Sequence, residues 1–167
     1  MYRFLPDYMS ESILKIDYDT LYDMGYRGLC FDIDNTLTEM NTTDVKDETI
    51  ALISSLKEKG FRICILSNAV RRRTVEVALK LDVEYVHMAF KPLKKGYIKA
   101  MVLLGLPGGS CVMIGDQLFT DIKGGKKAGF LTILTSILNE KESADIRFRR
   151  IFERIIIEKY GREIKAI

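Results

Sequence analysis

The sequence has few of the residues that disulfide-bonded, zinc-binding or membrane-spanning proteins need. Its 167 residues include three cysteines and a single histidine, to which we assign no role. The cysteines are odd in number and stand singly in apolar runs, so we expect reduced core residues and neither a disulfide framework nor a zinc site. No apolar run reaches the roughly 18 residues of a membrane-spanning helix, and the amino terminus lacks the apolar core of a secretion signal. We therefore expect a cytoplasmic protein.

The charge of the chain is nearly balanced but unevenly distributed. The net charge is +3, and 47% hydrophobic and 29% charged residues are typical of one globular domain, expected to span residues 1–167. Residues 71–99 hold eight basic and three acidic residues, and residues 141–167 hold eight and five. Such basic segments keep a protein soluble, attract anionic substrates or rest against an anionic membrane. We expect no nucleic-acid partner.

Short apolar segments alternate with segments of helical periodicity along most of the chain. This alternation predicts a doubly wound, Rossmann-like α/β fold, in which helices cover both faces of a parallel sheet. The predicted strands are 28–31, 61–66, 85–86, 111–114 and 131–134, and the predicted helices are 45–59, 95–104 and one beginning at Arg71.

The two ends of the chain give weaker patterns. Residues 1–25 are predicted to form short helices packed across one edge of the sheet, ending at Gly25. From residue 143 to residue 167 the spacing predicts an amphipathic helix with a basic outer face. Such a helix either docks its apolar face on its own domain, which we favour, or lies on a membrane surface.

Two aspartates, Asp32 and Asp34, follow the apolar segment 28–31. Side chains at i and i+2 of an extended chain point to the same side, so these carboxylates should converge at the carboxyl end of a strand, where open α/β sheets bind ligands. A divalent cation such as Mg²⁺ would offset their repulsion and recruit a phosphate. We therefore predict that Asp32 is a metal-bound nucleophile and that Asp34 is the general acid and base.

Polar or basic residues also follow the next predicted strands. Ser67 and Asn68 come directly after strand 61–66, where a hydroxyl could donate to a phosphoryl oxygen, although Ser-Asn is also a common helix cap. Arg71-Arg72-Arg73 then open a helix, and cations at this position oppose the helix dipole unless an anion lies nearby. Lys91 precedes a proline and is therefore predicted to be presented from a loop.

A second acidic pair follows strand 111–114. Gly115 permits a close approach of the backbone, Asp116 stands at the end of the strand, and Asp121 lies five residues further on, at the start of a helix. Carboxylates in these positions can complete an oxygen cage for Mg²⁺.

Taken in order, these segments resemble the four motifs of the haloacid dehalogenase (HAD) superfamily of phosphatases. The matching segments are Asp32-Ile33-Asp34-Asn35-Thr36, Ser67-Asn68, Lys91-Pro92 and Gly115-Asp116-Gln117-Leu118-Phe119-Thr120-Asp121. The resemblance implies that Asp32 accepts the phosphoryl group, that Asp34 is the acid and base, and that Lys91 offsets charge. The implied Mg²⁺ ligands are Asp32, the backbone carbonyl of Asp34, Asp116 and, directly or through water, Asp121. The implied substrate-binding residues are Thr36, Ser67 and Asn68.

The spacing of the motifs leaves no room for a large cap domain, so an open site suited to a bulky substrate is expected. The fuller resemblance is to subfamily IIIA proteins of the YqeG type, related to phosphatidylglycerophosphate phosphatases. It begins at Phe4-Leu5-Pro6 and extends through Gly124-Gly125 and the strand after Gly129. It implies a phospholipid head group, phosphatidylglycerophosphate, as substrate at a membrane surface.

Two alternatives remain open at this stage. One is a soluble phosphatase of sugar or nucleotide monophosphates, which the basic segment 71–99 fits equally well. The other is a phospho-accepting receiver-type module, which shares the doubly wound fold. Asp34 favours a hydrolase over the receiver module, because it supplies the acid and base that hydrolysis needs.

Overall fold

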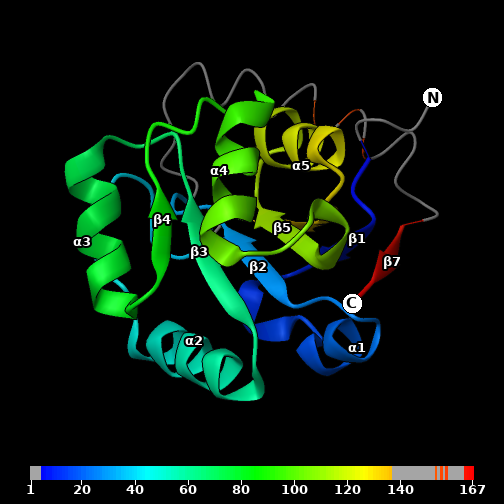
Figure 1. The fold of residues 1–167 in the computed structure, drawn as a ribbon, viewed down its shortest axis with the longest axis horizontal. Coiled ribbons are helices and arrows are strands. Elements are labelled where there is room, and N and C mark those ends of the chain that lie inside the picture. Colours follow the sequence, from blue (N-terminus) through cyan, green and yellow to red (C-terminus); the bar gives the residue numbers. More distant parts are fainter. Residues whose placement is uncertain (1–4, 137–152, 154, 156, 158–163) are drawn as a thin grey trace.

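A parallel seven-stranded sheet forms the centre of the structure (Figure 1). The computed structural model describes residues 5–136, 153, 155, 157 and 164–167. The strands follow the order β4-β3-β2-β5-β6-β1-β7, and every neighbouring pair is parallel. Their bounds are β1 Tyr8–Ser10, β2 Gly28–Phe31, β3 Arg62–Leu66, β4 Glu84–Val86, β5 Cys111–Gly115, β6 Leu131–Thr135 and β7 Lys165–Ala166.

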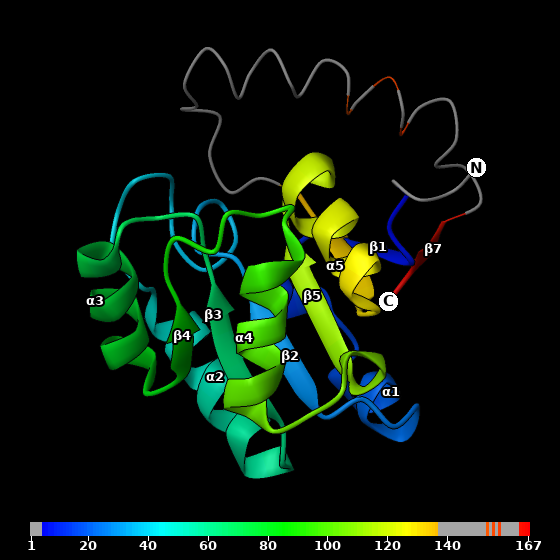
Figure 2. The ribbon, with the colours of Figure 1, turned by 45° about the horizontal axis from the view of Figure 1, so that its top comes forward.

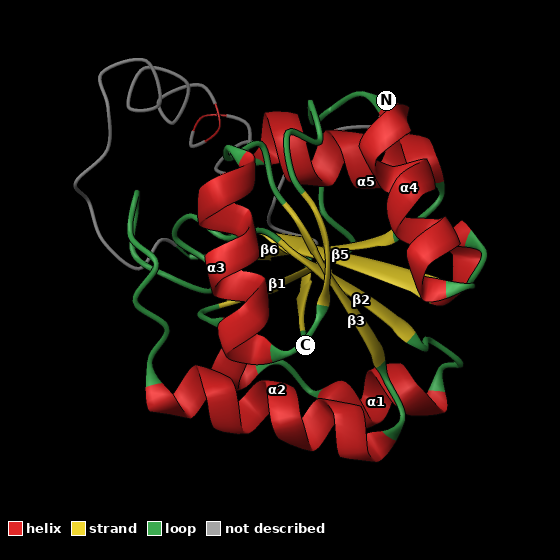
Figure 3. Ribbon diagram, turned by 60° about the vertical axis from the view of Figure 1, so that its left-hand side comes forward, coloured by secondary structure: helices red, strands yellow, loops and turns green. Residues whose placement is uncertain are grey.

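Helices cover both faces of this sheet, as the sequence predicts (Figure 3). Helices α1, α2 and α3 pack on one face and α4 and α5 on the other. Their bounds are α1 Tyr18–Asp23, α2 Asp47–Lys59, α3 Arg71–Leu81, α4 Lys94–Leu104 and α5 Lys123–Ala128, with shorter turns at η1 Ile13–Lys15, η2 Gly108–Ser110 and η3 Leu118–Ile122.

The central strands are buried on both sides, which explains why they read as continuous apolar runs. In β2, Leu29 and Phe31 pack with the first helix layer and Cys30 packs with the second. The three cysteines, Cys30, Cys64 and Cys111, are all buried and free. The expectation of reduced core cysteines is confirmed.

The amino-terminal segment differs from the prediction of helices alone. It forms η1 and α1, but residues 8–10 are strand β1, which pairs with β6 and β7. The Asp7 carboxylate anchors this strand by accepting bonds from the backbone N–H and the hydroxyl of Thr132, at 2.9 and 2.8 Å, and from Lys126 at 2.7 Å. A three-residue strand near the edge of a sheet is too short to give a periodic signal.

The predicted carboxyl-terminal helix lies mostly outside the described residues. Glu153, Ile155 and Ile157 are helical, and Ile157 packs against the apolar cluster of Leu118, Ile122 and Leu134. The prediction is wrong at its far end, because residues 165–166 form strand β7. At residues 165–166 the backbone hydrogen bonds to β1 determine the structure, although the sequence pattern there is helical.

The parallel sheet brings the carboxyl ends of β2, β3, β4 and β5 to one edge (Figure 2). The Asp32 N–H donates to the Ile114 carbonyl at 3.0 Å, and the Ser67 N–H donates to the Val86 carbonyl at 3.0 Å. These bonds extend the sheet by one residue and fix the first polar residue after β2 and β3. Two segments could hold a cap. Residues 32–46 contain no named helix or strand and residues 67–91 contain only α3 and β4, in line with the predicted absence of a cap. Among the helices of the described residues, none combines the length and the apolar character needed to cross a bilayer.

Candidate active site

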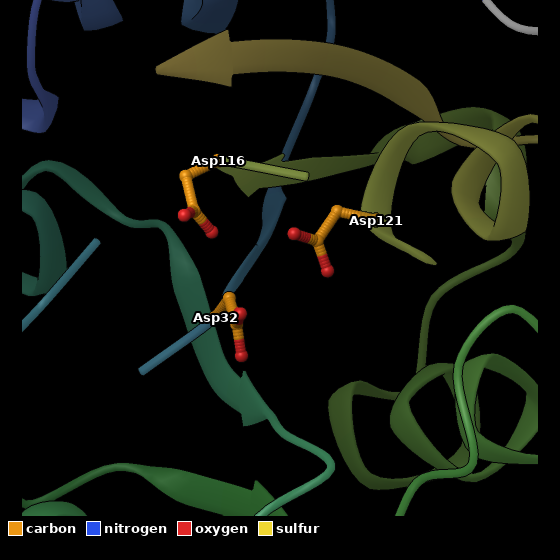
Figure 4. A group of neighbouring side chains, drawn as sticks. All are labelled: Asp32, Asp116 and Asp121. Atoms are coloured by element: carbon orange, nitrogen blue, oxygen red, sulfur yellow. The ribbon is translucent and has the colours of Figure 1, made fainter. Parts of the chain in front are cut away.

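Three buried carboxylates meet at this edge of the sheet. Asp32, Asp116 and Asp121 each offer an oxygen atom within 4.8 Å of the other two. Figure 4 shows Asp32 approaching from the end of β2, Asp116 from the end of β5 and Asp121 from the helical turn that follows. Because β2 and β5 are hydrogen-bonded neighbours, two residues far apart in the sequence end side by side.

The approach of Asp121 depends on Gly115, the last residue of β5. A Cβ at position 115 would lie 2.4 Å from Asp121 Oδ2, so only glycine leaves space for this carboxylate. The Gln117 N–H donates to Asp121 Oδ2 at 3.1 Å, and η3, the π-helical turn 118–122, carries Asp121 back over the strand end. The close backbone approach predicted at Gly115 is therefore a close approach of a side chain to the backbone.

Tyr97 supports this turn from α4. Its hydroxyl lies 3.0 Å from the Thr120 carbonyl and 3.2 Å from the Asp121 carbonyl, and the ring is fully buried. Burial holds the pKa of Tyr97 well above its usual range, so the phenol is a donor at all relevant pH values. The contact requires Gly124, where a Cβ would lie 2.4 Å from the Tyr97 oxygen.

Lys91 forms the positive centre of the site. Its Nζ lies 2.8 Å from Asp32 Oδ1 and 2.7 Å from Asp121 Oδ1, and its side chain is 2% exposed. Burial alone would lower the pKa of Lys91, but the two carboxylates raise it above its usual value. The ammonium group therefore stays charged, as the sequence-based role requires.

One lysine does not balance three carboxylates. Burial raises the pKa of Asp32 to about 6, with the charges of Asp121 and Asp34 acting in the same direction and Lys91 opposing them. Fully ionised, the three carboxylates and the ammonium group carry a net charge of −2 in a buried space. A divalent cation with a preference for oxygen, such as Mg²⁺, fits both this charge and this set of donors.

Asn68 positions the loop that carries Lys91. The Lys91 N–H donates to Asn68 Oδ1 at 2.7 Å, and Asn68 Nδ2 donates to the Lys91 carbonyl at 3.2 Å. The peptide bond between Lys91 and Pro92 is cis. The sequence suggested a substrate contact for Asn68, whereas the structure gives its amide a contact with the backbone of Lys91.

Two buried hydroxyls, those of Thr36 and Ser67, follow Asp32 in the chain at the ends of β2 and β3. Thr36 Oγ1 is buried and has no hydrogen-bond partner among the described residues. Ser67 Oγ accepts a bond from the Ala69 N–H at 3.1 Å, which leaves its own proton to donate. Unsatisfied buried donors are costly, so an anionic oxygen beside them would be stabilised.

Asp34 does not join the three-carboxylate cluster through its side chain. Its two oxygens accept a pair of bonds from the Arg73 guanidinium, both at 2.5 Å, and Oδ1 also accepts from the Asn41 N–H at 2.8 Å. Arg73 comes from the first turn of α3. Asp34 is therefore an anion near the helix start, as expected from the Arg71-Arg72-Arg73 run. A metal contact through the Asp34 backbone carbonyl stays a prediction.

Comparison with known proteins gives a family. A model of the haloacid dehalogenase-like hydrolases matches residues 40–129, slightly more than half of the chain. The putative HAD-hydrolase YfnB from Bacillus subtilis, solved bound to magnesium, superimposes with a TM-score of 0.56 at 16% identity, covering 78% of this chain and 98% of that chain. At this level of identity the likeness concerns the fold alone.

Two relatives match over almost the whole chain. "Probable phosphatase YqeG" of Bacillus subtilis (strain 168) is 32% identical over 160 residues, which are 96% of this chain and 93% of that protein. "Phosphatidylglycerophosphate phosphatase 1, chloroplastic/mitochondrial" of Arabidopsis thaliana is 28% identical over 95% of this chain, which spans 49% of that longer protein. With a family model over more than half of its length and a relative 32% identical along nearly all of it, the chain belongs to the haloacid dehalogenase-like hydrolases.

Proposed function

We propose that this protein is a Mg²⁺-dependent phosphate monoester phosphatase that works through an aspartyl-phosphate at Asp32. The observation that carries the proposal is the buried cluster of Asp32, Asp116 and Asp121 at the carboxyl edge of a parallel sheet, with Lys91 paired to Asp32 and Asp121. Mg²⁺ would be held by the three carboxylates together with the Asp34 backbone carbonyl. When bound, it supplies positive charge against the phosphoryl oxygens.

In the first half of the proposed reaction, an oxygen of the Asp32 carboxylate attacks phosphorus. A bond forms between Asp32 and phosphorus as the bond to the leaving oxygen breaks. Asp34, protonated on one oxygen in place of one of its two bonds from Arg73, gives the leaving oxygen that proton. Lys91, Thr36 and Ser67 donate hydrogen bonds to the equatorial oxygens, where negative charge accumulates. Thr36 Oγ1 suits this role because nothing among the described residues satisfies it.

In the second half, water replaces Asp32 on phosphorus. Asp34 takes a proton from the water, whose oxygen attacks phosphorus, and the bond to Asp32 breaks to return a free carboxylate and inorganic phosphate. Asp34 is thus needed twice, first as acid and then as base. This double use separates the proposal from a receiver-type module, which keeps its phosphoryl group for signalling.

Replacement of the nucleophile tests the chemistry. Asp32→Asn should lower kcat for para-nitrophenyl phosphate to background while the fold is kept, because an amide cannot form the acyl phosphate. Steady-state kinetics with Mg²⁺ measures this, and Asp23→Asn on the exposed end of α1 is the matched control. Full activity in Asp32→Asn would falsify the mechanism.

Thermal unfolding tests the metal site separately from turnover. Mg²⁺ at saturating concentration should raise the Tm of the wild type by several degrees, because it binds only the folded state. Asp116→Asn should unfold at the same or a higher temperature than the wild type without metal, since one of three crowded charges is gone, and should gain little from Mg²⁺. An equal Mg²⁺ shift in both proteins would place the metal elsewhere.

The contact between Arg73 and Asp34 makes Arg73 a proposed positioning residue for the acid. Arg73→Gln should lower kcat more than KM, by about 10-fold or more for an alkyl phosphate and less for para-nitrophenyl phosphate, whose leaving group needs little help from an acid. The ratio of the two kcat values is the measurement. Arg71→Gln, on the same turn but exposed, serves as control. A uniform loss on both esters would indicate a structural role only.

For the substrate, we propose a phospholipid head group of the phosphatidylglycerophosphate type. Support comes from the Arabidopsis relative and from the segments 32–46 and 67–91, which hold no cap that would exclude a lipid. A panel of esters should give the highest kcat/KM for phosphatidylglycerophosphate in mixed micelles, at least about 10-fold above sugar and nucleotide monophosphates. A preference for a soluble ester would select the alternative of a soluble small-molecule phosphatase.

A further inference from the structure

Two loops that flank the catalytic edge expose large apolar side chains. Val70 precedes α3 and is 62% exposed, and Phe90 and Leu93, on either side of Lys91 and Pro92, are 59% and 61% exposed. Met88, at the start of the same loop, is 47% exposed. We call these four side chains the apolar rim. Exposed apolar residues that gather beside a site mark an interaction surface more often than single ones do.

The two loops form one unit at the same edge of the sheet. The Met88 N–H donates to the Ala69 carbonyl at 3.0 Å, and the Ala89 N–H donates to the Ser67 carbonyl at 2.9 Å. The amide of Asn68 adds the two bonds to the Lys91 backbone described above. Hydrogen bonds therefore hold the two loops together, and the backbone of the rim keeps a fixed position relative to Lys91.

The backbone of the rim is in a conformation that apolar residues rarely adopt. Met88 and Phe90 have φ values of 43° and 53°, in the left-handed region that asparagine and glycine tolerate best. The two neighbouring side chains differ in exposure: that of Lys91 is buried in the site, and that of Phe90 is exposed. A large exposed ring in a disfavoured backbone conformation beside Lys91 is a feature for which a functional reason is sought.

Basic residues surround the rim. Arg71 and Arg72 follow Val70, and Lys94 and Lys95 follow Leu93, and all four are exposed. Neither residues 67–75 nor residues 87–99 include an aspartate or glutamate. Arg73 and Lys91 are already paired with carboxylates, so the positive charge that remains is on the outer surface.

The geometry points to an anionic lipid bilayer as the partner of the apolar rim, with Val70, Met88, Phe90 and Leu93 entering the interface and the four exposed cations lying among the head groups. Apolar side chains within a ring of cations match both layers of such a surface. The inference deepens the proposed function, because it would hold the open site at the level of a lipid phosphate. It depends on that function only for the identity of the substrate.

A double variant that keeps the backbone tests the rim. Phe90→Asn suits a left-handed residue, and Leu93→Ser suits the N-cap position that Leu93 occupies before α4, so both changes preserve the loop. The matched control is Leu79→Gln with Val102→Gln, two side chains that are each 75% exposed but lie near the far ends of α3 and α4. Binding is measured by co-sedimentation with vesicles of phosphatidylcholine, with or without about one third phosphatidylglycerol.

The wild type and the control should bind the anionic vesicles and bind neutral vesicles weakly. The rim variant should lose about 10-fold or more in affinity for the anionic vesicles, which is what withdrawing two large apolar groups from the interface implies. Failure of the wild type to bind, or equal binding by both variants, would overturn the inference. So would a wild-type dimer that the rim variant converts to a monomer, because the rim would then join two copies of the chain.

Activity on para-nitrophenyl phosphate without vesicles separates this inference from the proposed function. If the wild type hydrolyses para-nitrophenyl phosphate but does not bind vesicles, the proposed phosphatase activity stands and the proposed lipid contact is wrong. If the wild type binds vesicles through the rim but hydrolyses no phosphate ester, the lipid contact stands and the proposed phosphatase activity is wrong. Vesicle binding itself needs no catalysis, so a rim variant with altered turnover still gives a decisive result.

Discussion

The site depends on one buried ammonium group between carboxylates that repel one another. Lys91 contacts Asp32 and Asp121 at 2.8 and 2.7 Å, and these ion pairs are among the most deeply buried described in the chain. A buried pair is costly unless its geometry is well supported. That support comes from three sides: Asn68 fixes the Lys91 backbone, Tyr97 fixes the turn of Asp121, and β2 fixes Asp32 at the centre of the sheet.

The sequence predicts the parts of this arrangement that follow from strand ends. Apolar segments stop at polar or acidic residues, and parallel strands bring their carboxyl ends to one edge, so the sequence places Asp32 and Asp116 at the same edge. The pairing of β2 with β5 then makes them neighbours. The α/β fold with helices on both faces and the hydrolase family are confirmed. Asp121 is predicted from its place five residues after Asp116 and from the motif resemblance. The structure adds how it reaches the site: no side chain fits at position 115, so its carboxylate can approach the strand.

The rest could not be predicted because it depends on contacts between distant segments. Nothing near Tyr97 in the sequence indicates that its hydroxyl reaches a turn more than twenty residues away. The glycine at position 124 is needed for this contact, because a side chain there would clash with the Tyr97 ring. The partner of Arg73 is equally hidden, since it lies 39 residues earlier, at Asp34. Strands β1 and β7 are too short for periodicity, and their pairing to each other joins the two ends of the chain.

The three buried cysteines can report on local opening of the core. All three thiols are completely buried in the layer beneath α4, and burial raises the pKa of Cys111 to about 11. Alkylating reagents attack thiolates and need access, so modification of the folded protein must wait for the sheet to separate from that helix. Because Cys30 lies on β2, two residues before Asp32, the labelling rate of this thiol follows how often the strand that precedes the Asp32 carboxylate becomes exposed to solvent.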